Sequence, residues 1–322
     1  MMPAPSVLLE KIHIGVSSCL VGERVRYDGD HKRDAFITDT LGAAFVLIPV
    51  CPEVAIGMGV PRPPIRLVGD AITPKALGVD DPTLDVTSSL TDFGRHMATE
   101  LGDISAYIFK SRSPSCGPSR VKLYREGKVT RHQVAGLYAR EIMTSHSLLP
   151  IEDEERLAEP LLRDNFIERI FAYRRWQQLL SSGFTPAKLV EFHSRNKLTL
   201  MAHSTVYYRT LGQLVSSVKA FKPQHLAEQY GNGFMAALKH TATRKRHTNV
   251  LQHLMGYLKK HIDHADKAEL LEVIDAYRSG TVPLIMPLTL LRHHFRIYPQ
   301  HYIENQTYLY PDPLEMQLRF NN

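Results

Sequence analysis

The chain has 322 residues, of which 43% are hydrophobic and 22% are charged, a balance typical of a folded globular protein. This length exceeds what one hydrophobic core usually supports, so we expect about two domains. The N-terminus lacks a basic segment followed by a long apolar stretch, and the longest apolar run, around AAFVLIPV, is too short to cross a membrane. These features argue against a secreted or membrane protein and make the cytoplasm the expected compartment.

The net charge of +6 is distributed unevenly along the chain. Residues 1–185 hold 22 basic and 23 acidic side chains, whereas residues 186–322 hold 17 basic and 10 acidic ones. All three cysteines lie in the first part, and 11 of the 16 histidines lie in the second. We therefore expect the chemistry in the first part and an anionic partner, if there is one, on the second.

The first part alternates short apolar runs with helical patterns. Runs at 11–19, 43–51 and 104–113 predict strands, and the helical pattern LTDFGRHMATEL precedes the third. The apolar residues are continuous rather than alternating, as in strands that are buried on both faces of a parallel sheet. The expected fold class is α/β, with a small Rossmann-like parallel sheet in a domain of residues 1–152.

The second part reads as helices. Residues 153–183 form one long helical pattern that ends at Gly183, and Thr185-Pro186 is a typical start of the next helix, so residues 153–185 are expected to connect two domains. Further helical patterns fall near 186–198, 202–221, 224–239, 247–263 and 266–279. They predict an all-α, basic domain over residues 186–322.

Each cysteine follows one of the predicted strands. Cys19, Cys51 and Cys116 come from three separate loops, just beyond the carboxyl ends of the apolar runs. Ligands bind at this edge of an open parallel sheet, so we expect the three thiols to meet at one site. An odd number of cysteines in a reducing compartment favours metal binding or catalysis over disulfides.

Three thiolates suit more than one kind of centre. Structural zinc usually takes four protein ligands, the chain has no Cys-x-x-Cys pair, and catalytic zinc usually has histidines among its three ligands. A cubane iron–sulfur cluster held by three cysteines would keep one iron without a protein ligand, and that iron would be a Lewis acid with affinity for sulfur. The residues alone leave zinc, a cluster and three unrelated cysteines open.

Three motifs together resemble a known family. VSSCLVGERVRYDG (16–29), PVCPEVAIGMGVPRPPIRL (49–67) and FKSRSPSCG (109–117) resemble the signature of the thiouracil desulfidases. The whole chain is similar to the longer form of that family, in which a helical, YbgA-like domain follows and the substrate is 4-thiouridine of tRNA. The match covers about residues 12–150 by motif and, more loosely, 186–310.

The resemblance implies a cofactor and a reaction. It implies a [4Fe-4S] cluster held by Cys19, Cys51 and Cys116, and a replacement of C=S by C=O without change of oxidation state. It assigns the catalytic carboxylate to Glu53 and the catalytic serine to Ser113. These residue types suit the chemistry, because hydrolysis of a thiocarbonyl needs a base that activates water and donors that stabilise the ring as charge develops.

Three further residues beside these motifs are candidate substrate contacts. They are Ser18, Asp28 and Arg62. Each also has a structural interpretation, since Asp-Gly is a turn signal and an arginine in a proline-rich loop often packs against its neighbours. His31 could be a fourth ligand, but a surface position is the simpler interpretation.

The densest positive charge of the chain lies in KHTATRKRH (239–247), with two further lysines downstream. If helices bring these residues together, they form a face that binds phosphates, and nearby tyrosines could stack on an unpaired base. The candidate RNA-binding residues are Arg244, Lys245, Arg246, Lys259 and Lys260. The alternative is an ordinary solvated helix face.

The sequence therefore predicts an iron–sulfur-dependent desulfidase that removes sulfur from 4-thiouridine in tRNA. A desulfidase of free thiouracil is the alternative enzyme, and a non-catalytic iron–sulfur sensor that binds RNA is an alternative of another class. A sulfur-inserting tRNA enzyme would run the opposite chemistry, but the chain has no Gly-rich loop of the Walker type for ATP.

Overall fold

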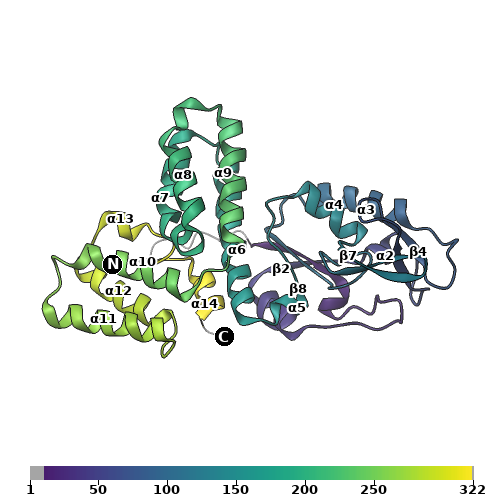
Figure 1. Ribbon diagram of the computed structural model, residues 1–322, viewed down its shortest axis with the longest axis horizontal. Coiled ribbons are helices and arrows are strands. Elements are labelled where there is room, and N and C mark those ends of the chain that lie inside the picture. The colour runs from purple at the N-terminus through teal and green to yellow at the C-terminus, as the bar shows by residue number, and fades with distance from the viewer. Residues whose placement is uncertain (1–10, 321–322) are drawn as a thin grey trace. The chain divides into compact units, whose positions relative to one another are not determined.

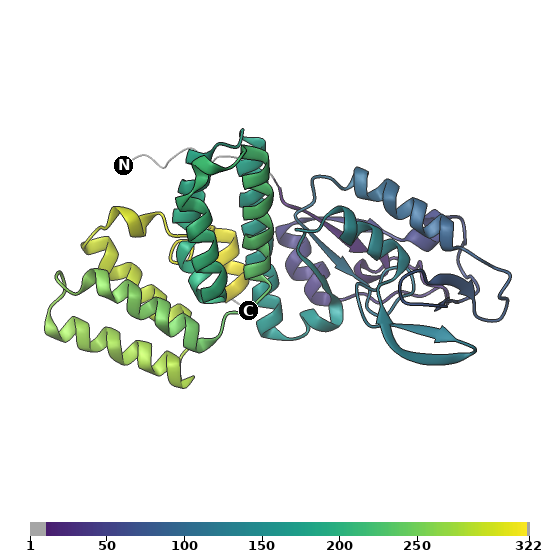
Figure 2. The ribbon, with the colours of Figure 1, turned by 45° about the horizontal axis from the view of Figure 1, so that its top comes forward.

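The computed structural model describes residues 11–320 (Figure 1). The chain forms two compact units, one up to Phe166 and one from Ile167 onward. The boundary falls inside helix α6 (Pro160–Ser181), within the residues 153–185 that the sequence predicts as a helical connector. Strands lie only in the first unit among the described residues, and the second is helical (Figures 1 and 2).

The first unit contains the predicted parallel sheet. Its strands are β1 (His13–Ser17), β2 (Val46–Val50), β5 (Ala106–Phe109) and β8 (Ile151–Asp153), in the order β2-β1-β5-β8. All neighbouring pairs are parallel, and β5 is buried at every position, which is why its apolar run is continuous. The chain crosses from β1 to β2 on one side and to β5 on the other, so a topological switch point lies beside β1.

A second, mixed sheet was not predicted. It consists of β3 (Ile65–Val68), β4 (Lys75–Gly78), β6 (Val121–Arg125) and β7 (Lys128–Val134), in the order β4-β3-β6-β7. The β3–β6 pair is parallel, and the two outer pairs are antiparallel. These strands mix buried and exposed positions. They therefore lack the continuous apolar run that predicts the strands of the first sheet.

Helices of the first unit cover these sheets. The segments are a 3₁₀ turn (Ser18–Val21), a π-helical turn (Phe36–Leu41), α1 (Gly42–Ala44), α2 (Pro52–Ala55), α3 (Thr87–Glu100), α4 (Leu137–Ser145) and α5 (Glu154–Leu157). Leu90 of α3 and Leu137 of α4 share an apolar cluster with buried residues of the second sheet. Cys51 and Cys116 lie on the segments that lead from the first sheet to the second.

The second unit consists of helices and a short 3₁₀ turn (Val218–Ala220). After the remainder of α6 come α7 (Pro186–His203), α8 (Thr205–Ser216), α9 (Pro223–Leu238), α10 (Arg244–Leu258), α11 (His264–Ser279), α12 (Ile285–Ile297), α13 (His301–Glu304) and α14 (Pro313–Phe320). The predicted cap holds, because Thr185 Oγ1 accepts the N–H of Lys188 at 3.2 Å. Helix α11 ends at Gly280 as predicted, but α12 to α14 were not predicted.

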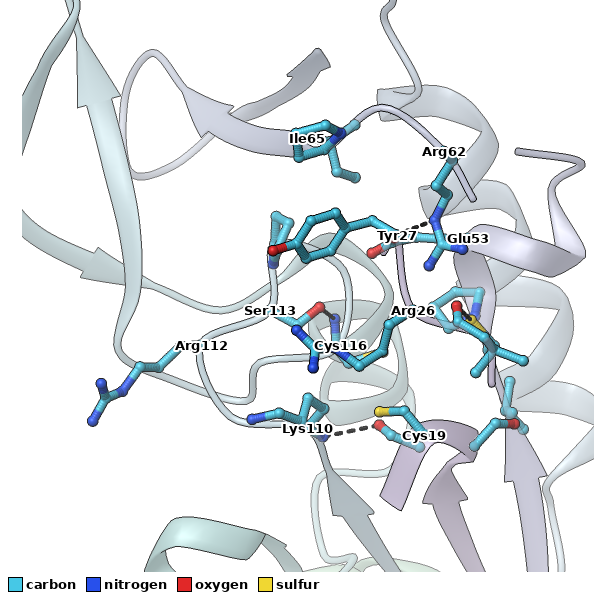
Figure 3. Close-up of a pocket in the computed structure, with 18 of the residues that line it drawn as sticks. Cys19, Arg26, Tyr27, Glu53, Arg62, Ile65, Lys110, Arg112, Ser113 and Cys116 are labelled. Carbon is cyan, nitrogen blue, oxygen red and sulfur yellow. Dashed lines mark hydrogen bonds and ion pairs between the residues drawn. The ribbon is translucent and has the colours of Figure 1, made fainter. Parts of the chain in front are cut away.

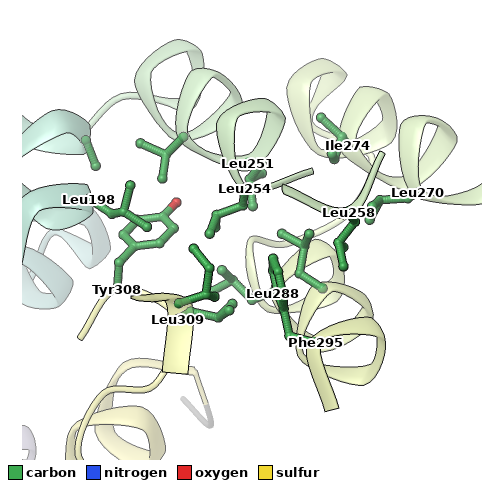
Figure 4. Close-up of a cluster of buried hydrophobic side chains, with 14 of the residues drawn as sticks. Leu198, Leu251, Leu254, Leu258, Leu270, Ile274, Leu288, Phe295, Tyr308 and Leu309 are labelled. Atoms are coloured by element: carbon green, nitrogen blue, oxygen red, sulfur yellow. The ribbon is translucent and has the colours of Figure 1, made fainter. Parts of the chain in front are cut away.

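One apolar core joins these helices (Figure 4). The apolar side of α10 faces this core, since Val250, Leu251, Leu254 and Leu258 are fully buried. Side chains of α7, α11 and α12 pack against it, so the unit has a core of its own. Among the helices of residues 11–320, none combines the length and apolar character that crossing a membrane would require.

Candidate functional site

Three loops bring the cysteines to one cavity (Figure 3). Cys19 follows β1 by two residues, Cys51 follows β2 directly, and Cys116 lies in the loop after β5. All three line a cavity of about 390 Å³, a size suited to a small ligand. The convergence that the sequence predicted is therefore present, at the carboxyl edge of the parallel sheet beside its switch point.

The thiols are shielded from water and lie near one another. Burial raises the pKa of the Cys19 thiol to about 11, and the Lys110 ammonium opposes this rise. Burial also raises the pKa of Cys116, and the charges of Cys51, Glu53 and Cys19 raise it further. Deprotonation of these thiols therefore needs a cation or a metal centre that stabilises the thiolate.

A single metal ion and a cubane cluster need different spacings of their thiol ligands. Within residues 11–320, no three His, Cys, Asp or Glu side chains are grouped so that they could hold a single metal ion. A tetrahedral zinc ion would need each sulfur about 2.3 Å from the same atom. In a cubane cluster each thiolate binds a different iron, so sulfurs farther apart fit it.

Glu53 is held rigidly beside Cys51. It lies in the first turn of α2, which Pro52 begins. Its Oε2 accepts from Arg62 Nε at 2.7 Å, and its Oε1 accepts from Ser115 Oγ at 2.7 Å. The Arg62 side chain is only 3% exposed and also donates to the carbonyl of Gly59 at 3.0 Å. Arg62, predicted as a substrate contact, lines the cavity and orients the Glu53 carboxylate.

The loop after β5 is a tight turn that carries Ser113 and Cys116 together. Ser113 Oγ accepts the backbone N–H of Cys116 at 3.1 Å and that of Ser115 at 3.3 Å. The chain passes so close at Gly136 that a Cβ there would lie 2.6 Å from the carbonyl oxygen of Ser115. Glycine at this position is therefore a condition for the geometry of the loop.

A charged group that the sequence analysis missed supports the same loop. Glu154 Oε2 accepts the backbone N–H of Ser111 at 2.8 Å, and its Oε1 accepts the Ser111 hydroxyl at 2.7 Å and contacts Lys110 Nζ. The backbone N–H of Lys110 donates to Ser17 Oγ at 2.9 Å. Lys110 is the second residue of the FKSRSPSCG motif, so its position in the same motif as Cys116 could have marked it as a candidate site residue. Glu154 follows β8, a strand that the sequence did not predict.

Comparison with known proteins identifies the two parts of the chain. Uncharacterized protein YbgA of Escherichia coli (strain K12) is 36% identical over 159 residues, which cover 48% of this chain and 93% of YbgA. Uncharacterized protein YbbK of Bacillus subtilis (strain 168) is 32% identical over 108 residues, covering 32% of this chain and 71% of YbbK. A family model described as 2-thiouracil desulfurase matches residues 14–154. The chain belongs to the thiouracil desulfidase family.

The matched range, residues 14–154, contains the three cysteines, Glu53 and Ser113. A second model, described as a protein of unknown function (DUF1722), matches residues 197–313, so a YbgA-like domain follows, as the motifs implied. A solved structure described as [4Fe-4S]-dependent thiouracil desulfidase TudS is 31% identical and covers 46% of this chain and 94% of its own, with a TM-score of 0.36. The family match over residues 14–154 shows an enzyme of the thiouracil desulfidase type.

The other predicted substrate contacts of the desulfidase separate into two groups. Ser18 lines the cavity with the thiols. Asp28 is not among the residues that line it; its carboxylate accepts the N–H of Asp30 at 3.2 Å and pairs with Arg26 at 3.3 Å. The Asp-Gly pair therefore builds a turn. His31 is likewise engaged in its own loop, where its Nδ1 accepts the N–H of Arg33 at 3.1 Å.

The predicted RNA-binding residues of the desulfidase do not form one cluster. Arg244, Lys245 and Arg246 begin α10, whereas Lys259 and Lys260 follow its end. A helix of 15 residues separates its ends by about 20 Å, at 1.5 Å per residue. The sequence shows how many cations one helix carries, but their separation along it decides whether they act together.

Two of these arginines stabilise other helices. Arg244 Nη1 donates to the carbonyl of Tyr277 at 3.2 Å, in the last turn of α11, and Arg246 Nη1 donates to the carbonyl of His203 at 2.8 Å, at the end of α7. Helix C-termini leave carbonyls without partners and favour cations. Arg244 and Arg246 therefore have a structural role that the sequence analysis did not predict, and the exposed Lys245 does not share it.

Proposed function

We propose that this desulfidase removes sulfur from 4-thiouridine in tRNA and that Cys19, Cys51 and Cys116 hold a [4Fe-4S] cluster. One observation supports the proposal most: thiols from the ends of three strands border the same cavity in which a carboxylate is fixed by an arginine and a serine. Reducing cytoplasm is the expected compartment, since thiolate ligands and oxygen-sensitive clusters suit it.

The donor set fits such a cluster. Three soft thiolates without a histidine suit iron–sulfur chemistry. Lys110 lies near Cys19, and Arg62 lies near Cys51, where each favours the thiolate form. When bound, a cluster with three protein ligands supplies one open iron, a Lewis acid with affinity for sulfur.

Glu53 is the general base of the proposed reaction. Its carboxylate takes a proton from the water that attacks the thiocarbonyl carbon, while Arg62 and Ser115 hold it in one orientation. The water oxygen becomes the oxygen of the new C=O, the C–S bond breaks, and sulfur leaves as sulfide. No electron is gained or lost, so the protein needs no redox partner for turnover.

Ser113 is the proposed donor to the pyrimidine. Its oxygen accepts two backbone N–H groups, which leaves the hydroxyl proton for an acceptor in the cavity. A hydrogen bond from this proton stabilises negative charge on the ring as water adds. Ser18, at the same edge, is the second proposed contact.

The charge of the second unit supports the proposed substrate class. Residues 186–322 carry seven more basic than acidic side chains, which favours a polyanion such as tRNA. A thiolated base reaches a cavity only when it leaves the stack, at a cost of a few kcal/mol that contacts in the cavity offset. Free thiolated pyrimidines fit the same chemistry without the second unit.

The test begins with anaerobic reconstitution of the full chain with iron and sulfide. We expect four irons per chain for a cubane, followed by loss of thiocarbonyl absorbance and release of sulfide from tRNA that contains 4-thiouridine. The Cys51→Ser variant should lose the iron, whereas Lys245→Ala, far along the chain, should keep it. Turnover of free thiouracil alone would contradict the tRNA proposal, and a colourless zinc protein would contradict the cluster.

A further inference from the structure

Tyrosines from three helices gather on one face of the helical unit. Tyr208 lies on α8, Tyr257 on α10 and Tyr302 on α13, and all three pack, partly buried, against the core of this unit. The rings of Tyr257 and Tyr302 are stacked, with centroids 5.9 Å apart and planes inclined by 29°. Half-buried aromatic rings present a flat apolar surface while their polar ends reach water.

Lys197 of α7 extends this surface. Its Nζ lies 5.7 Å from the ring centroid of Tyr208. Tyr208 is also near Tyr302: burial raises the pKa of the Tyr302 hydroxyl, and the neighbouring phenols of Tyr257 and Tyr208 raise it further, to about 12. We refer to Lys197, Tyr208, Tyr302 and Tyr257 as the tyrosine strip.

The charge around the strip is largely positive. Lys259 and Lys260 follow Tyr257 at the end of α10; both are exposed, and within residues 11–320 neither forms an ion pair. Two acidic residues are near in sequence: Asp263, three positions after Lys260, caps α11, and Glu304 of α13 faces His301 at 4.0 Å. Unlike Arg244 and Arg246 at the other end of α10, these lysines are not engaged with backbone carbonyls.

We propose that the tyrosine strip is the RNA-binding surface of the helical unit and that it takes unpaired bases. Aromatic rings stack on the faces of unpaired bases whatever their sequence, and nearby lysines neutralise the phosphates. The stacked pair Tyr257 and Tyr302 supplies the rings, and Lys197, Lys259 and Lys260 supply the charge. The inference rests on the proposed function, because it assumes that the substrate is an RNA.

Binding measurements test the strip without any cluster or turnover. The full chain is titrated with tRNA, with single-stranded oligouridine and with duplex RNA. Tyr257→Leu and Tyr302→Leu keep apolar contacts with the core and remove the flat ring, so each should weaken binding of oligouridine by between about 5-fold and 100-fold, the value of one base stacked on an aromatic side chain. Tyr257→Phe and Tyr302→Phe should bind as the wild type does.

The two ends of α10 provide a matched control. Lys259→Ala and Lys260→Ala should each lower the slope of log affinity against log salt by about one, whereas Lys245→Ala should not change it. Trp176 is the single tryptophan of the chain and lies buried in this unit, so its fluorescence reports whether each variant is folded. Unchanged affinity in both leucine variants, or equal affinity of the wild type for duplex and unpaired RNA, would overturn the proposal.

Turnover separates this inference from the proposed function. With the strip in use, the reconstituted Tyr257→Leu variant has a higher KM for thiolated tRNA and an unchanged rate on free thiouracil. If the wild type releases sulfide from thiouracil but not from tRNA, the proposed substrate is wrong. The oligouridine titration then still decides whether the strip binds RNA.

Discussion

Each unit contains a buried ion-pair network, and the two networks differ in what surrounds them. In the first unit, Glu53 pairs with Arg62 and lines the cavity of the three thiols. In the second, Glu168 lies 2.9 Å from His203 and 3.0 Å from Arg319, and a further carboxylate and arginine continue the network. Glu168 is only 4% exposed, so its partners enclose it completely.

The comparison shows when a buried carboxylate indicates chemistry. Buried ion pairs are common structural features and contribute little net stability, although breaking one is costly. Glu168 has partners on all sides and serves the fold. Glu53 has partners on one side and a cavity lined by three thiols on the other, so it can meet a ligand. The cavity, and not the ion pair, marks the candidate active site.

The largest effect is expected from a change in the ion pair of Glu53 and Arg62 beside the thiols. Glu53→Gln keeps the size of the side chain and its contact with Ser115 but removes the base and the charge partner of Arg62, so turnover on thiouracil per folded, iron-loaded chain should fall by about 10²- to 10⁴-fold. Iron content should stay that of the wild type. Asp28→Asn, a carboxylate outside the cavity, is the matched control and should stay within about twofold. Wild-type turnover in Glu53→Gln would remove Glu53 from the mechanism.

Substitution of Glu168, the buried carboxylate of the helical unit, should lower stability and not turnover. Burial tends to raise the pKa of Glu168, but Arg319 and His203 together lower it well below its usual range, so the residue is a carboxylate at neutral pH. Glu168→Gln leaves those cations without their charge partner and should destabilise the helical unit by about 3 to 5 kcal/mol. Urea unfolding followed by Trp176 fluorescence measures this loss.

The same variant also tests the contrast between the networks. Turnover on thiouracil per folded, iron-loaded chain should be unchanged in Glu168→Gln, because the network has no part in the cavity. A large loss of turnover in chains that are fully folded would contradict the division of roles between the two networks.

Acid should weaken the helical unit through two buried histidines. Burial lowers the pKa of His247 to about 3 and that of His193 to about 4, and the rings face Tyr308 and Tyr230 through hydrogen bonds of 2.8 and 3.1 Å. Between these values and 6.5 the unfolded chain binds more protons than the folded one, so stability falls as pH falls. From pH 6.5 to pH 5 we expect a loss of about 1 to 2 kcal/mol per histidine.

Unfolding measured by Trp176 fluorescence at pH 7.5, 6.5 and 5 tests this slope. His247→Gln keeps a hydrogen-bonding group near Tyr308 and removes the titration, so its stability should fall less steeply with pH than that of the wild type. An identical slope in wild type and variant would show that His247 does not titrate in this window. Circular dichroism checks that the variant keeps its helices at pH 7.5.

The sequence was sufficient for the features that local patterns encode. Continuous apolar runs gave β1, β2 and β5, and the position of each cysteine just after a run gave the meeting of the thiols. Thr185 and Gly280 marked a helix start and a helix end because caps and left-handed turns have their own residue preferences. Such signals need only a few neighbouring residues.

Features that depend on distant residues were not predicted. The contact of Lys110 with Glu154 joins residues 44 positions apart, and the second sheet pairs short strands whose patterns are weak. Asp28 fits either a substrate contact or a turn in the sequence, and the structure shows its carboxylate bonded within its own loop. The roles of Arg244 and Arg246 depend on carbonyls of other helices, which no local pattern reveals.

The smallest expected effect is the difference in stability between two alanine variants on the first turn of α10, one at a bonded arginine and one at an exposed lysine. Arg246→Ala removes a charged donor from the carbonyl of His203 at the end of α7, so the helical unit should lose about 1 kcal/mol of stability. Lys245→Ala removes an equal charge from an exposed position and should leave the urea midpoint unchanged. Folded Arg246→Ala should bind oligouridine as the wild type does, because Tyr257, which supplies a stacking ring, lies near the other end of α10. Equal urea midpoints for the two variants would show that the Arg246 contact adds nothing to the fold and would return this turn of α10 to the candidate RNA-binding residues.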